Sequence, residues 1–77
     1  MVKQRPVTSF VVIKVLQKCG FVILRKKGSH VRMKHPDGRI TTVPTHGKET
    51  IGIGLLLRIL KDADMSKDDF FKLVEEI

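Results

Sequence analysis

The sequence lacks several features that mark common classes of protein. Its single cysteine, Cys19, has no partner for an internal disulfide, so a small secreted fold held together by disulfides is excluded. No run of 18 apolar residues exists that would suggest a membrane-spanning helix, and the first residues lack the apolar segment of a secretory signal. We therefore expect a cytoplasmic protein and interpret Cys19, at an apolar helix position, as a small core residue.

Acidic residues are scarce in the first two thirds of the chain. Residues 1–48 hold 11 Lys and Arg but one acid, Asp37, whereas residues 49–77 hold four Lys and Arg and seven acids. A net charge of +7 placed in this way favours a polyanionic partner, RNA or DNA, or an acidic protein surface. With 77 residues, we expect one small domain spanning residues 1–77, with a modest core.

The clearest local signal is a turn within residues 28–47, the stretch that holds all three histidines. In His-Pro-Asp-Gly-Arg at 35–39, Pro suits the start of a type I turn and Gly suits the left-handed position that follows it. This pattern predicts a β-hairpin in which His35 pairs with Arg39. The same register places Val31 opposite Val43 and His30 opposite Pro44.

Alternation of side chains along the two strands then separates a core face from an exposed face. The core face carries Val31, Met33, Thr41 and Val43. The other face carries His30, Arg32, Lys34 and Thr42, with Ile40 as an apolar exception, and His46 lies diagonal to His30. The candidate functional surface is therefore this cationic face of the sheet, with His30 at one end of it.

The remaining segments predict three helices and one more strand. Thr8 caps a helix with apolar Val12, Ile13, Leu16 and Cys19, and Gly20 ends it. Residues 21–27 form a strand whose buried face the pattern leaves open. A second helix, starting near Gly52–Gly54 and closing at residues 62–64, carries a stripe of Ile53, Leu56, Ile59, Leu60 and Ala63. Ser66 and Asp69 form a capping box for a last helix with apolar Phe70, Leu73, Val74 and Ile77. The predicted fold class is α+β, in the order α-β-β-β-α-α, with a three-stranded antiparallel sheet and helices on one face.

Two kinds of site are rejected on spacing. Cys19, His30, His35 and His46 include no closely spaced pair that would begin a zinc site, so no metal ligand is predicted. Ser29 and His30 are adjacent on a strand and point to opposite faces, so they cannot form a nucleophile–base pair. His35, on the core face beside the turn, is interpreted as structural.

An ordered set of short motifs carries a resemblance to a known family. Gly20-Phe21, Lys27-Gly28-Ser29-His30, residues 35–39, Val43-Pro44-Thr45-His46 and residues 56–61 resemble the HicA (YcfA-like) toxins of type II toxin–antitoxin pairs. The resemblance implies a fold like that of double-stranded-RNA-binding domains. It also implies cleavage of single-stranded messenger RNA by an mRNA interferase that uses no metal, His30 as the catalytic residue, and neutralisation by a HicB-type antitoxin.

The resemblance and the residue pattern converge on one mechanism. RNA supplies its own nucleophile, the ribose 2′-hydroxyl, so the protein must remove a proton and stabilise charge on phosphorus. His30 is the candidate base. Arg32 and Lys34, with Lys26 or Lys27 from the neighbouring strand, are candidate phosphate-binding residues, and His46 is a candidate RNA contact and acid.

Two other hypotheses remain open from the sequence. In the first, the chain is a non-catalytic RNA-binding module and His30 only contacts its ligand. In the second, it is a protein-interaction domain whose cationic face binds an acidic partner. Cleavage of RNA, and loss of that cleavage when His30 is replaced, distinguish the toxin from both.

Overall fold

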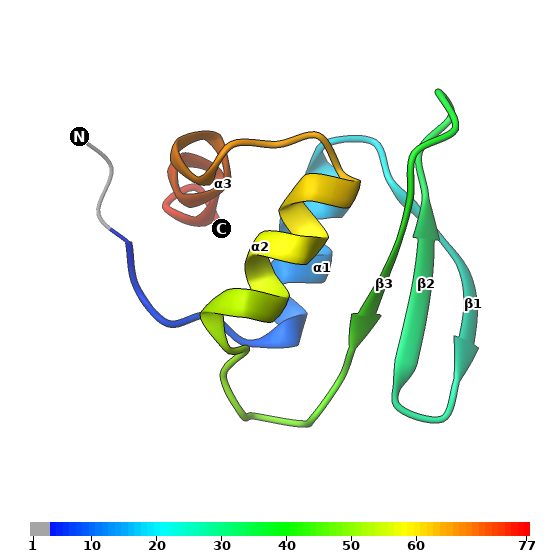
Figure 1. The fold of residues 1–77 in the computed structure, drawn as a ribbon, viewed down its shortest axis with the longest axis horizontal. Coiled ribbons are helices and arrows are strands. Elements are labelled where there is room, and N and C mark those ends of the chain that lie inside the picture. The colour runs from blue at the N-terminus through cyan, green and yellow to red at the C-terminus, as the bar shows by residue number, and fades with distance from the viewer. Residues whose placement is uncertain (1–3) are drawn as a thin grey trace.

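The computed structural model describes residues 4–77, which form a three-stranded sheet packed against three helices (Figure 1). The order is the predicted α-β-β-β-α-α. The bounds are α1 (Ser9–Lys18), β1 (Val22–Lys27), β2 (His30–Lys34), β3 (Ile40–Pro44), α2 (Ile53–Asp62) and α3 (Lys67–Val74).

The hairpin has the register predicted from its turn. The backbone N–H of His35 donates to the carbonyl oxygen of Arg39 at 2.8 Å, and Gly38 adopts the left-handed conformation with φ of 102°. Val31 pairs with Val43 and His30 with Pro44, as expected. The sheet order is β1-β2-β3, and both pairings are antiparallel.

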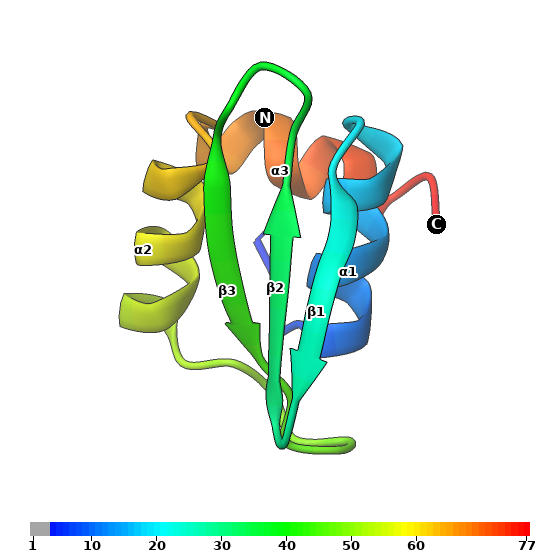
Figure 2. The same cartoon turned by 90° about the vertical axis from the view of Figure 1, so that its right-hand side faces the viewer.

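All three helices lie on one side of the sheet, and Figure 2 looks onto the side that they leave open. The predicted core face of the hairpin, Val31, Met33, Thr41 and Val43, is buried beneath the helices. The buried hydroxyl of Thr41 has a hydrogen-bond partner there, because its Oγ1 donates to Asp62 Oδ2 of α2 at 3.0 Å. The two-layer α+β fold with one open sheet face is therefore confirmed.

The helix boundaries follow the predicted local signals. The side chain of Thr8 accepts a hydrogen bond from the backbone N–H of Val11 at the start of α1, and that of Ser66 accepts one from Asp69 at the start of α3. Gly52 precedes α2, within the predicted starting region, and offers no side-chain cap. Local capping by Thr8 and Ser66 thus determines where α1 and α3 begin, whereas α2 begins without a side-chain cap.

The burial of three residues in and after α2 and α3 differs from the prediction. Ile53, assigned to the apolar stripe of α2, is 58% exposed, because it is the first helical residue and only borders a hollow beside residues 4–7. Ile77 is also exposed, since it lies beyond the end of α3. Phe71, in contrast, is buried beside Phe70, because α3 contacts both α1 and α2 and so is covered over a wider arc.

Candidate nucleic-acid interface

The open face of the sheet carries two cross-strand rows of residues, and most of these residues are polar. In the first row, Lys27 of β1 pairs with His30 of β2, and His30 pairs with Pro44 of β3. In the second row, Arg32 is central, with Arg25 on β1 and Thr42 on β3 as its partners. Residues paired across neighbouring strands project to the same face, so one surface holds an imidazole and three cationic side chains.

A shallow hollow on this face joins the two rows. Its lining residues are Arg25, Lys27, His30, Arg32 and Thr42. His30 is exposed, as predicted, and it begins β2 directly after the Gly28-Ser29 turn. A ligand lying in the hollow would therefore meet His30 and three positive charges without entering the protein core.

The structure brings together some of the predicted RNA-binding residues and separates others. Lys27 and Arg32 share the hollow with His30. Lys34 is on the same face but at the far end of β2, where it pairs with Val22 and Ile40. Lys26 pairs with Val31, whose side chain is buried on the helix side, so Lys26 faces away from His30.

His46 does not line the hollow. It is an exposed residue of the loop that follows β3, and its carbonyl oxygen accepts a hydrogen bond from the N–H of Glu49 at 3.2 Å. The expected diagonal relation to His30 depended on β3 continuing through residue 46. The strand ends at Pro44, so the alternation of faces no longer determines where His46 points.

Arg25 is a member of the hollow that sequence reasoning missed. The sequence does not show which face of residues 21–27 is buried, and simple alternation from an apolar Phe21 would not place Arg25 on the exposed face. The register between β1 and β2 shifts between Ile23 and Arg25, and this irregularity changes the face on which Arg25 lies. The available signal was the basic run Arg25-Lys26-Lys27 after an apolar start.

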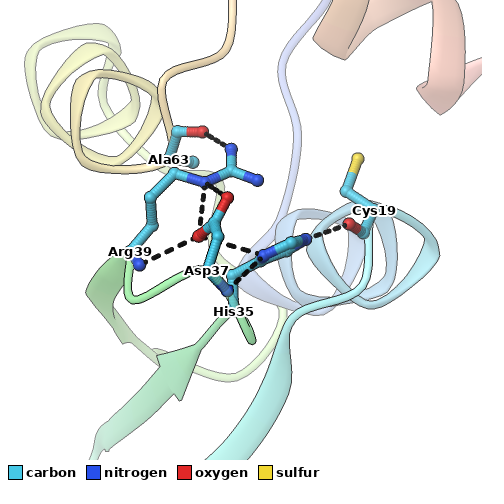
Figure 3. Close-up of polar contacts among 5 residues, drawn as sticks. All are labelled: Cys19, His35, Asp37, Arg39 and Ala63. Atoms are coloured by element: carbon cyan, nitrogen blue, oxygen red, sulfur yellow. Dashed lines mark hydrogen bonds and ion pairs between the residues drawn. The ribbon is translucent and has the colours of Figure 1, made fainter.

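His35 is confirmed as a structural residue (Figure 3). Its Nε2 lies 3.0 Å from the carbonyl oxygen of Cys19, and its Nδ1 accepts from the backbone N–H of Asp37 at 3.1 Å. Its ring packs edge-on against Phe21 with centroids 5.2 Å apart. These contacts join the hairpin turn to the end of α1, on the side of the sheet opposite to the hollow.

A second network around the turn extends to α2. Arg39 Nε donates to Asp37 Oδ2 at 2.9 Å, Arg39 Nη1 donates to the carbonyl oxygen of Ala63, and the guanidinium lies 5.2 Å from the centre of the Phe21 ring. The hydrogen bonds from Arg39 lower the pKa of the Asp37 carboxyl from its ordinary 3.8. Arg39 thus stabilises the turn and is not part of the cationic hollow.

Cys19 is only partly buried, and its surroundings do not activate it as a nucleophile. Burial raises the pKa of the thiol, and the opposing charge of Arg39 does not reverse this effect. Within residues 4–77, no three His, Cys, Asp or Glu side chains gather in a way that could hold a metal ion. In the same part of the chain, no helix is long and apolar enough to cross a bilayer.

Comparison with known proteins identifies one family. The model of the HicA toxin of bacterial toxin–antitoxin systems matches residues 11–65, which run from α1 through the whole sheet to the loop after α2. The matched region contains every residue of the hollow. A search of curated proteins found no match to the chain.

Proposed function

The chain belongs to the HicA family of toxins from bacterial toxin–antitoxin systems, and from this membership we propose that it is an endoribonuclease that cleaves messenger RNA without a metal ion. As a member of this family it is the toxin of such a pair, and its partner is an antitoxin. We propose that the antitoxin is of the HicB type, that both proteins act in the cytoplasm, and that His30 is the general base.

The proposed reaction uses the ribose 2′-hydroxyl of the substrate as its nucleophile. Neutral His30 takes the proton from this hydroxyl while its oxygen attacks the adjacent phosphorus. The bond from phosphorus to the 5′-oxygen breaks, the 5′-oxygen takes up a proton from water, and the upstream fragment keeps a 2′,3′-cyclic phosphate. The protonated His30 then releases its proton to solvent. Lys27, which pairs with His30 across the neighbouring strands, stabilises the negative charge that grows on the phosphoryl oxygens.

One observation carries this proposal: His30 is exposed in a hollow whose other lining residues include Arg25, Lys27 and Arg32. A base needs access to the substrate, and a phosphodiester needs positive charge around it; this arrangement supplies both. The three strands contain no Asp or Glu that would neutralise these cations. An exposed imidazole among unneutralised cations supports acid–base chemistry on a phosphate ester.

Replacement of His30 tests the base directly. We expect His30→Gln, which keeps a polar side chain but cannot exchange a proton near neutral pH, to lower the cleavage rate by about 10² to 10⁴-fold. His30→Ala should lose as much, and added imidazole should restore part of its activity, because the hollow is open to solvent. His46→Gln is the matched control, since it removes an exposed histidine that does not line the hollow.

The substrate and products test the rest of the mechanism. A chelator should leave the cleavage rate unchanged, and an oligonucleotide with 2′-deoxyribose at the scissile position should resist cleavage. The upstream product should carry a 2′,3′-cyclic phosphate or its hydrolysed form. Cutting of the deoxy substrate, or near-full activity of His30→Gln, would contradict the proposal.

A non-catalytic RNA-binding module is the second candidate function. Among the residues that line the hollow, His30 is the one candidate for proton transfer, and no carboxylate lines the hollow as a general acid. The basic open face would be sufficient for binding alone. Wild-type protein that binds RNA, leaves it intact and keeps its affinity after His30→Ala would favour this function.

A further inference from the structure

We infer that Arg25 and Arg32 form a two-arginine clamp for one phosphodiester group, and that an extra residue in β1, Leu24, turns Arg25 toward it. The inference rests on the proposed function for the identity of the ligand as RNA. It adds a phosphate-binding residue, Arg25, and a structural device that orients it.

The pairing of β1 with β2 contains one irregularity. Ile23 pairs with Met33 and Arg25 pairs with Arg32, so Leu24 is an additional residue in β1 that has no partner of its own in β2. An insertion of one residue into one strand of an antiparallel pair is a β-bulge. Because side chains alternate with a period of two, one additional residue exchanges the two faces for everything beyond it.

The exchange of faces follows from the pairing of β1 with β2, because all residues of β1 itself are exposed. Before Leu24, Phe21 is buried and Ile23 lies opposite the buried Met33, so odd-numbered positions face the helices. After Leu24, Arg25 lies opposite Arg32 on the open face. Uninterrupted alternation from Phe21 would have placed Arg25 toward the helices, and the bulge therefore makes it part of the hollow.

Arg25 and Arg32 form a like-charge pair that the protein itself does not neutralise. Like charges directly opposite each other on neighbouring strands destabilise a sheet. The ion pairs found within residues 4–77 join Lys18 to Glu76 and His35 and Arg39 to Asp37, and neither arginine of the clamp takes part. An anion between the two guanidinium groups would replace repulsion with two attractive contacts.

Phosphate is the anion that this geometry suits. A guanidinium presents a planar set of donors that match phosphate oxygens, often in pairs. Arg32 and His30 are two residues apart on β2 and face the same side, so their rows are separated by roughly 7 Å along the strand. The clamp therefore holds a phosphate next to the one at which His30 acts, and it positions the RNA strand for cleavage.

The test compares two neighbouring cations on β1. In a His30→Gln background, which keeps the RNA intact, the affinity for a short single-stranded oligoribonucleotide is measured over a series of salt concentrations. Arg25→Gln should weaken binding by on the order of tenfold, as expected for loss of one charge-assisted contact, and should make the log–log salt slope shallower by about 0.7. Arg25→Lys should keep the slope but lose part of the affinity, because it keeps the charge and loses the planar donors.

Lys26→Gln is the matched control. Lys26 is adjacent to Arg25 and is also exposed, but it pairs with Val31 on the other face. Its replacement by Gln removes the same charge as Arg25→Gln. Its replacement should leave both affinity and slope nearly unchanged. Equal effects of the two replacements would overturn the inference, because the bulge would then not select Arg25.

The remaining outcomes separate the clamp from the proposed function. Unchanged affinity of Arg25→Gln, with wild-type protein that cleaves RNA, would overturn the clamp and leave an acidic protein surface as the ligand of the two arginines. Wild-type protein that binds RNA through Arg25 but never cleaves it would contradict the proposed function and support the clamp. Absence of RNA binding in the wild-type protein would overturn both.

Discussion

The Nε2 atom of His35 lies 3.0 Å from the backbone carbonyl oxygen of Cys19, which joins the hairpin turn to the C-terminal end of α1 (Figure 3). The backbone N–H of Asp37 donates to the other ring nitrogen of His35, Nδ1, at 3.1 Å, and the Asp37 carboxylate lies 3.0 Å from the same nitrogen. His35 is therefore a structural residue, whereas His30, five residues earlier, is exposed in the cationic hollow.

Replacement of His35 should destabilise the protein. We expect His35→Ala to lower the free energy of unfolding by about 1–3 kcal/mol, because the Cys19 carbonyl loses its partner and Phe21 loses a packed ring. Urea denaturation at neutral pH measures the difference. The control, His30→Ala, removes an exposed side chain and should stay within about 0.5 kcal/mol of wild type. Equal losses of stability from both replacements would contradict the structural role assigned to His35.

Alanine at two glycines should have effects of opposite sign. Gly20 has φ of 99°, and a Cβ there would lie 2.9 Å from His35 Nε2, so Gly20→Ala should cost about 1–3 kcal/mol through backbone strain. Gly54 lies inside α2 with open space around it, and Gly54→Ala should stabilise by about 0.4–1 kcal/mol. Thermal unfolding of the two variants checks the signs, and a neutral Gly20→Ala would show that the turn tolerates a side chain.

Stability should depend on Asp37 at acid pH. The hydrogen bonds from Arg39 hold the pKa of this carboxyl below its ordinary 3.8, and the His35 ring lies 3.0 Å away. A lowered pKa in the folded state adds stability above the ordinary value and loses it as the pH falls through the folded value. Asp37→Asn should therefore be less stable than wild type at pH 7, and the difference should shrink below about pH 4. Urea denaturation across this range measures it; a difference that does not change with pH would contradict the assignment.

RNA binding should weaken steeply with salt. Each phosphate contact of a single strand contributes roughly −0.7 to the log–log slope, so three to five contacts predict a slope of about −2 to −3.5. Neutral replacements at Arg32 and Lys34, on the open face, should make the slope shallower. The matched replacements are Lys67 and Lys72, which lie on α3 among acidic residues and should have no such effect. Equal changes at both places would locate the interface elsewhere.

Features set by neighbours in the chain were predictable from the sequence. Pro36 and Gly38 determine the turn, and the turn determines the register, so Val31, Met33 and Val43 were assigned correctly to the core. The same alternation placed His30 on the exposed face. Thr8 and Ser66 cap their helices through backbone groups three residues away, which is why these helix starts were also predictable.

Other features depend on what lies opposite each element in the folded chain. Phe71 is buried because α3 contacts two helices at once, and residues 21–27 could not be divided between faces because the bulge at Leu24 exists only relative to β2. Arg25 consequently could not be assigned to the hollow from its own segment, and the same ambiguity of face is why the sequence could not choose between Lys26 and Lys27. The sequence alone determined the hairpin and the exposure of His30, through local backbone preferences and period-two alternation. Only the pairing of β1 with β2 decided which cations lie beside His30, because a one-residue shift in register moves every side chain beyond it to the opposite face of the sheet.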